Sequence, residues 1–142
     1  MENHFEKLIN MYNSGPINKL YKPTLTIEHG SAEITQAVDS QFFHAANALH
    51  GSVYFKLLDD AAYFAANSLV KDVFVVTANF TIQLLRPVKK GVLTAKAKVV
   101  SNGQNIIYAQ ADLFNERGKL VASGTGNFMR STTLLSEEIG YR

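Results

Sequence analysis

One long segment that is apolar around most of a helical circumference places the strongest constraint on the fold of this chain. Ser52 is a plausible N-cap residue, and neither Gly nor Pro interrupts residues 52–70. The apolar side chains are not confined to one stripe; they are Val53, Tyr54, Phe55, Leu57, Leu58, Ala61, Ala62, Tyr63, Phe64, Ala65, Ala66 and Leu69. A helix with this pattern is buried, so the rest of the chain must wrap around it.

Strand-like runs after this helix can supply the wrapping. They span 73–86, 91–101, 104–116 and 119–131. Turn signals separate them, at Arg86 and Pro87, at the Ser-Asn-Gly of 101–103 and at the Asn-Glu-Arg-Gly of 115–118. We therefore predict consecutive hairpins that form an antiparallel meander with one buried face. In the first run, alternation predicts one face with Ala78, Phe80, Ile82 and Leu84, and a polar face with Thr77, Asn79, Thr81 and Gln83.

For the segment before the buried helix, the sequence predicts shorter secondary-structure elements. Residues 2–13 have the apolar spacing of a short helix, which ends at the breaker cluster 14–16. Residues 24–38 predict either one strand with a bulge at Gly30 or a hairpin, and residues 39–50 predict a loop. The tail after Arg130 is expected to be loosely held. Together these elements predict an α+β hotdog fold in a single domain over 1–142, with its core at about 24–131.

Composition narrows the class of protein. A length of 142 residues suits one domain, and the chain has no cysteine, which excludes a disulfide framework, a Cys-ligated zinc site and a thiol nucleophile. The formal net charge of only +2 argues against a nucleic-acid partner. No apolar run is long enough for a membrane span, and residues 1–6 lack the features of a secretory signal. We expect a cytoplasmic protein without a membrane partner, a metal site or a cofactor of its own.

Two adjacent carboxylates in the buried helix are the first candidates for chemistry. Asp59 and Asp60 lie in an otherwise apolar stretch, where an ionised side chain is costly unless it is partnered or used. The plainer alternative is that one of them reaches solvent or a backbone donor at the edge of the helix. That alternative weighs more for Asp60 than for Asp59.

The surrounding residues resemble the motif of the PaaI-type acyl-CoA thioesterases of the hotdog superfamily. His50, Gly51 and Asp59 have the spacing of the family's His-Gly-Gly and catalytic Asp. The run 79–87 resembles the family's strand that ends in Arg-Pro, and the likeness extends over about 24–131. It implies hydrolysis of an acyl-CoA to a carboxylic acid and free coenzyme A. It also implies a homodimer with shared active sites, or a tetramer formed from two such dimers.

Two positions depart from the family's pattern. Ser52 stands where the family has its second Gly, and an N-cap role accommodates the change. His44 stands where the family has an Asn that helps to hold the thioester carbonyl. A neutral imidazole N–H can donate the same hydrogen bond, or Asn47 can replace it from a shifted loop.

The chemistry of thioester hydrolysis gives the main motif residues distinct roles. Gly51 lies where the helix begins, so its N–H can stabilise the oxyanion, and Asp59 can act as general base or nucleophile. The two lie eight residues apart, or about 12 Å along a helix, so they cannot flank one carbonyl within a single helix. Gly51 of one copy can face Asp59 of an antiparallel second copy. Thr77 matches a Ser or Thr that orients the attacking water in the family, or it is a plain surface residue of a strand.

The remaining candidates concern substrate binding. His50 is expected to fix the loop geometry beside Ser52, with Asn47 and Asp60 close to the ligand. Arg86, Lys89 and Lys90 can meet the phosphates of coenzyme A, or they are solvated charges at strand ends.

Two other functions stay open from the sequence. One is a hotdog module that binds acyl-CoA without turnover. The other is a hotdog hydratase or dehydratase for enoyl thioesters, which would pair His44 or His50 with Asp59.

Overall fold

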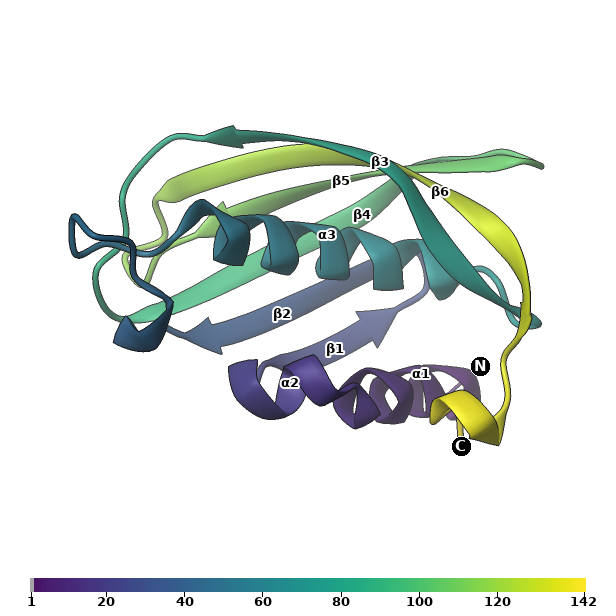
Figure 1. Cartoon of the computed structure of the whole chain (residues 1–142). Helices are drawn as coiled ribbons and strands as arrows, with labels where there is room; N and C mark the ends of the chain where they lie inside the picture. Colours follow the sequence, from purple (N-terminus) through teal and green to yellow (C-terminus); the bar gives the residue numbers. More distant parts are fainter. Residues whose placement is uncertain (1) are drawn as a thin grey trace.

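A six-stranded antiparallel sheet curls around one long helix in the computed structural model, which describes residues 2–142 (Figure 1). The helix, α3, spans Gly51–Asn67. The strands are β1 (Thr24–Glu28), β2 (Ser31–Ala37), β3 (Val73–Leu84), β4 (Val92–Asn102), β5 (Ile106–Phe114) and β6 (Leu120–Leu134). Their order in the sheet is β1-β2-β4-β5-β6-β3. The predicted sheet around a buried helix is confirmed.

Alanines explain how closely the sheet surrounds α3. Four alanines of the helix, Ala61, Ala62, Ala65 and Ala66, have no exposed surface. The concave face of β4 and β5 presents more small side chains, Ala95, Ala97, Ala109 and Ala111, between larger ones. Small residues on both surfaces let the helix approach the sheet, and Leu57 and Leu58 fill the remaining space.

The start of α3 differs from the sequence prediction. His50, not Ser52, is the N-cap residue: its Nδ1 accepts a hydrogen bond from the Ser52 N–H at 3.0 Å. The prediction of a Ser52 cap is wrong because a histidine ring can also accept from the free amides of the first turn. The N-cap is therefore two residues earlier than expected, and the helix begins at Gly51.

The pairing of β3 corrects the predicted meander. The hairpins β1/β2, β4/β5 and β5/β6 form, but β3 pairs with β6 and not with β4. Arg86 and Pro87 therefore begin a connection that passes β6 and β5 and leads to β4, between β2 and β5. Turn signals predict where a strand ends, but they do not identify the strand with which it pairs. The topology leaves β3 at an edge of the sheet with one unpaired side (Figure 1).

A β-bulge in β3 corrects the predicted faces of that strand. The register with β6 shifts between Thr77 and Asn79, and Ala78 lies exposed at the shift. Thr77 is half-buried, and its hydroxyl contacts α3, so it does not share the polar face of Asn79. An extra residue at a bulge reverses the alternation on one side of it. The predicted faces therefore hold from Asn79 to Gln83 and are reversed at Thr77 and Ala78.

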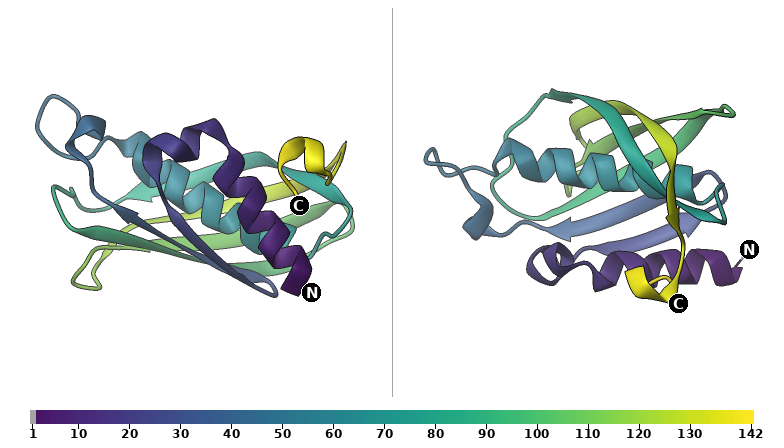
Figure 2. Two further views of the ribbon diagram at one scale, coloured as in Figure 1. Left: turned by 90° about the horizontal axis from the view of Figure 1, so that it is seen from below. Right: turned by 45° about the vertical axis from the view of Figure 1, so that its right-hand side comes forward.

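The N-terminal region contains more structure than the sequence predicts. Helix α1 (Glu2–Ser14) ends at the breaker cluster and is followed directly by a second helix, α2 (Pro16–Tyr21), which the sequence did not predict. Pro16 occupies the first turn of α2, where a missing N–H costs nothing. Both helices pack beside β1 and α3 and cover one side of the core (Figure 2). The predicted loop before α3 holds a short 3-10 helix, η1 (Ser40–Phe42).

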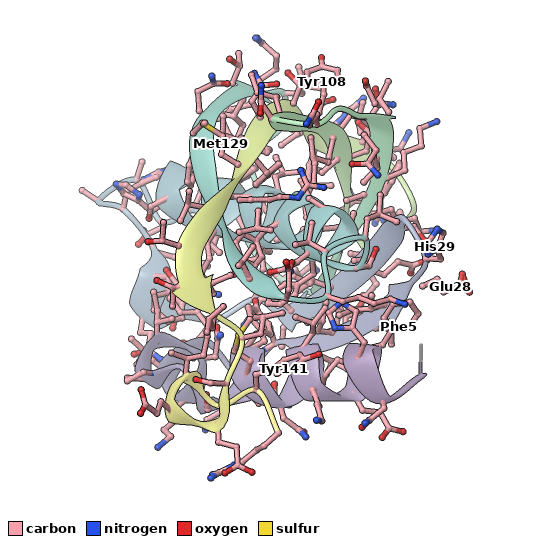
Figure 3. All side chains as sticks on the ribbon, turned by 90° about the vertical axis from the view of Figure 1, so that its right-hand side faces the viewer. Phe5, Glu28, His29, Tyr108, Met129 and Tyr141 are labelled. Carbon is pink, nitrogen blue, oxygen red and sulfur yellow. The ribbon has the colours of Figure 1, made fainter. Side chains whose placement is uncertain are left out.

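The prediction of a loose tail after Arg130 is wrong. Strand β6 continues to Leu134, and a 3-10 helix, η2 (Glu137–Ile139), folds back toward α1. The Tyr141 hydroxyl lies 2.7 Å from Nδ1 of His4, and Figure 3 shows Tyr141 beside the N-terminal helix. The two ends of the chain consequently lie near each other (Figure 2). Within residues 2–142, no helix has the length and hydropathy that crossing a membrane requires.

Candidate active site

Asp59 lies at the middle of α3, where the bulged part of β3 crosses the helix. Its Oδ1 accepts a hydrogen bond from Oγ1 of Thr77 at 2.9 Å. The two side chains line a cavity of about 430 Å³, together with Tyr12, Tyr63 and Phe74 among others. The bulge brings Thr77 to this position, because regular alternation would have turned it away from α3.

The surroundings of Asp59 favour its neutral form. Burial raises the pKa of this carboxyl to about 6, and the negative charge of Asp60 adds to the rise. The Thr77 hydroxyl and the Lys56 ammonium act in the opposite direction, because both stabilise the carboxylate. A carboxyl with a pKa near 6 is still ionised at neutral pH and is a stronger base than an exposed aspartate.

Gly51 lines a second cavity, of about 340 Å³, at the N-terminal end of α3. His44, Tyr54, Leu84 and Arg86 are among the residues around it. The N–H of Gly51 belongs to the first turn of the helix, and it has no hydrogen-bond acceptor within the described part of the chain. A free amide at the positive end of a helix is suited to an anion or an oxyanion.

The loop before α3 is fixed by backbone hydrogen bonds. The His44 N–H donates to the Ala48 carbonyl at 2.9 Å, and the His50 N–H donates to the Phe42 carbonyl at 3.0 Å. His44 is exposed, and its Nδ1 accepts from the Ala46 N–H at 3.1 Å, so Nε2 is the ring atom left for a ligand. Asn47 occupies the turn itself, with a φ of 63°, and does not line the Gly51 cavity.

His50 and Ser52 have local roles in the structure. The Nδ1 of His50 accepts from the Ser52 N–H and lies 2.8 Å from the Ser52 hydroxyl. A ring nitrogen that accepts from an amide carries no proton, so the hydrogen of this imidazole is on Nε2. Both side chains thereby fix the first turn of α3 and the direction of the Gly51 N–H.

The basic candidate residues lie in two different environments, a cavity wall and an exposed connection. Arg86 lines the Gly51 cavity, and its carbonyl accepts a hydrogen bond from the Tyr54 hydroxyl at 2.8 Å. Lys89 and Lys90 are exposed in the crossing connection and line neither cavity. Only Arg86 is therefore placed beside the Gly51 amide in one chain.

The sequence did not predict a polar cluster that lies beside Asp59. Asp60 accepts hydrogen bonds from the Tyr12 hydroxyl at 2.8 Å and from Nζ of Lys56 at 2.7 Å. Nζ of Lys56 also donates to Oδ1 of Asn18 at 2.7 Å. The spacing of Lys56 and Asp60, four residues apart on a helix, signals an ion pair. Nothing local in the sequence signals that Tyr12 and Asn18 join them, since both come from the N-terminal helices.

The structure does not bring Gly51 and Asp59 together in one chain. They line different cavities that share no lining residue. One cavity holds the carboxylate and the hydroxyl, and the other holds the free amide, His44 and Arg86. Among residues 2–142, no group of three His, Asp or Glu side chains is placed to hold a metal ion.

Comparison with known proteins identifies the family of this chain. The family model for the thioesterase superfamily matches residues 46–122, which is more than half of the chain and includes Gly51, Asp59 and Thr77. The chain belongs to the thioesterase superfamily. Its sequence is 31% identical to the acyl-coenzyme A thioesterase PaaI of Escherichia coli over 107 residues, which cover 75% of each protein.

Solved structures of superfamily members share the fold of this thioesterase-superfamily protein. The structure of the E. coli PaaI protein from the phenylacetic acid degradation operon superposes with a TM-score of 0.86 at 26% identity, and covers 95% of this chain and 98% of that one. A thioesterase of Haemophilus influenzae gives a TM-score of 0.78 at 25% identity, with 88% of each chain covered. The alignment with the E. coli protein extends over almost the whole chain.

Proposed function

We propose that this protein hydrolyses acyl-CoA thioesters to a carboxylic acid and free coenzyme A. The observation that carries the proposal is the Asp59 carboxylate, which is half-buried, hydrogen-bonded to Thr77 and open to a largely apolar cavity. The free Gly51 amide supplies the second group that the reaction needs. The similarity to the acyl-coenzyme A thioesterase of E. coli supports the choice of substrate class.

The proposed reaction uses these groups in sequence. Asp59 takes a proton from a water molecule held beside the Thr77 hydroxyl, and the water oxygen attacks the thioester carbon. The Gly51 N–H, with Nε2 of His44, stabilises the negative charge that develops on the carbonyl oxygen. The C–S bond then breaks, and the coenzyme A thiolate takes back the proton from Asp59.

The site is proposed to form between two copies of the chain. The unpaired edge of β3 carries exposed apolar side chains at Val76, which is 40% exposed, and Leu84, which is 55% exposed. Such an edge is prone to pair with another strand. Thr77 contacts Asp59, and a Cβ on Gly51 would lie 3.1 Å from Leu84. Strand β3 therefore connects two half-sites, one with Asp59 and Thr77 and the other with Gly51.

A two-fold axis that crosses β3 between Phe80 and Thr81, past the middle of the strand, would join the half-sites. Antiparallel pairing of β3 with its copy, centred between Phe80 and Thr81, sets Leu84 of the second copy opposite Thr77. Gly51 of the second copy follows its Leu84 and approaches Asp59 of the first. The same contact occurs twice, so a dimer would have two equivalent sites.

Thiol release from a panel of acyl-CoAs of varied chain length and aryl content tests the function. We expect hydrolysis of at least one member of the panel. Binding of an acyl-CoA without turnover would instead favour the binding module. Addition of water to an enoyl-CoA would favour the hydratase.

The pH dependence of hydrolysis should report the raised pKa of Asp59. The base must be ionised, so kcat/KM should rise tenfold per pH unit below a pH of about 6 and level off above it. A pH profile with the best acyl-CoA measures this limb. An unchanged rate down to pH 4.5 would contradict a base with this pKa.

Thr77→Val should lower the ionised fraction of Asp59 at neutral pH while nearly keeping the shape of the side chain at position 77. Loss of the hydroxyl removes a donor that stabilises the Asp59 carboxylate, so the pKa of Asp59 should rise further. We expect kcat/KM at pH 7 to fall by about three- to tenfold and the acid limb to move to higher pH. Thr77→Ser, which keeps the donor, should restore both values. Equal effects of Val and Ser would show that the hydroxyl has no role.

A further inference from the structure

The Lys56 ammonium is held in a nearly closed polar cluster beside Asp59. Its side chain is only 10% exposed, and Nζ contacts Oδ2 of Asp60 at 2.7 Å, Oδ1 of Asn18 at 2.7 Å and the Tyr12 hydroxyl at 3.1 Å. An ammonium has three N–H donors, and here three acceptors occupy them. Lys56 therefore has no donor left for a substrate, although it lines the Asp59 cavity.

The cluster joins three helices at the wall of this cavity. Tyr12 comes from α1, Asn18 from α2, and Lys56 and Asp60 from successive turns of α3. The Tyr12 carbonyl also accepts a hydrogen bond from Nδ2 of Asn18 at 2.7 Å. The positions of both charges are thus fixed by groups that lie far apart in the sequence.

Few other charges are placed to act on Asp59. The titratable groups around its cavity are Lys56, Asp60 and Tyr63 on α3 and Tyr12 on α1, while β3 contributes the neutral hydroxyl of Thr77. Burial raises the pKa of both tyrosines above the ordinary value, so they stay neutral. Lys56 and Asp60 are therefore the two charges of its own chain that Asp59 experiences at close range.

We propose that Lys56 and Asp60 are positioning residues for Asp59, and that their ion pair balances the charge beside it so that Asp59 is ionised at neutral pH. The inference rests on the proposed role of Asp59 as the base. Without Lys56, the half-buried Asp60 carboxylate would be left with one hydroxyl donor next to a second carboxylate. Two like charges so close together oppose each other's ionisation.

A double-mutant cycle on the pair tests the inference. Lys56→Met removes the cation and should move the acid limb of kcat/KM to higher pH by at least about 0.5. Asp60→Asn removes the anion and should move it to lower pH. The double variant K56M/D60N should lie close to the wild type. A role confined to packing would lower activity or stability without shifts of opposite sign.

Carboxyl ¹³C NMR titration of Asp59, assigned with Asp59→Asn, measures the same shifts without any turnover. It separates failure of this inference from failure of the proposed function. Opposite NMR shifts in the two single variants, in a protein that hydrolyses no thioester, would support the charge balance and reject the thioesterase. Shifts of the same sign, or none, in variants that keep the wild-type circular dichroism spectrum would overturn the inference.

Discussion

Asp59→Asn should lower kcat/KM for the best acyl-CoA substrate by about a hundredfold or more at pH 7. The amide of asparagine can still accept the hydrogen bond from Thr77, so the geometry at β3 is retained. It cannot take a proton from water, which removes the proposed base. Thiol release by the purified variant measures the loss.

The same substitution should stabilise the folded protein. Burial raises the pKa of Asp59 to about 6, above its ordinary value of 3.8, so at pH 7 the ionised carboxylate is less favourable in the folded state than in the unfolded state. Asparagine has no such charge. After allowance for solvent at the cavity mouth, we expect a gain of about 1 to 2 kcal/mol in the free energy of unfolding.

Two comparisons make the result on Asp59 specific. Asp72→Asn, at an exposed position before β3, should keep wild-type activity and stability. A loss of activity together with a gain in stability is expected for a residue that serves catalysis and destabilises the fold. Full activity of Asp59→Asn would show that Asp59 is not the base, and Asp60 would be the next carboxylate to examine.

Gly51→Pro should reduce kcat by about a hundred- to a thousandfold, the usual effect of losing one donor to an oxyanion. Proline removes the N–H that we propose to face the thioester oxygen. The first position of a helix tolerates proline, and His50 has a φ of −63° and a ψ of 143°, which suit the residue before it. The start of α3 should therefore survive the change, as circular dichroism can verify.

Gly51→Ala is the matched control for the proline variant. It keeps the N–H and adds a Cβ that would lie 3.1 Å from Cδ1 of Leu84, the end of a flexible side chain. We expect a loss of activity of less than about tenfold. Equal losses for Ala and Pro would show that the space at Gly51 matters rather than its amide.

The sequence predicted the central helix well because its signal is local. A run that is apolar all round, without Gly or Pro, can only be a buried helix, and the hairpins of β4, β5 and β6 have strong turns between them. The partner of β3 was not predictable, because the pairing with β6 depends on how the whole sheet curls. The bulge between Thr77 and Asn79 was not predictable either, because polar and apolar residues alternate through it in the sequence without interruption.

The candidate site was likewise predictable where its residues are close in sequence, and not where they come from distant elements. The resemblance through His50, Gly51 and Asp59 rests on residues close in sequence, and the structure places Gly51 and Asp59 in two separate cavities of one chain. The cluster of Lys56, Asp60, Tyr12 and Asn18 forms only when the N-terminal helices dock on α3. Helix α2 itself was missed because Gly15 and Pro16 suggest an end, whereas Pro16 here starts a new helix.

Complementation between two inactive variants tests most directly whether one site uses two copies of the chain. Gly51→Pro and Asp59→Asn chains are each purified, then mixed in equal amounts, unfolded and refolded together. Half of randomly formed dimers contain one chain of each kind, and each of these has one site with both an intact Gly51 and an intact Asp59. We expect recovery of about a quarter of the wild-type activity. Activity no higher than that of the separate variants, in a mixture shown to contain the mixed dimer, would contradict it.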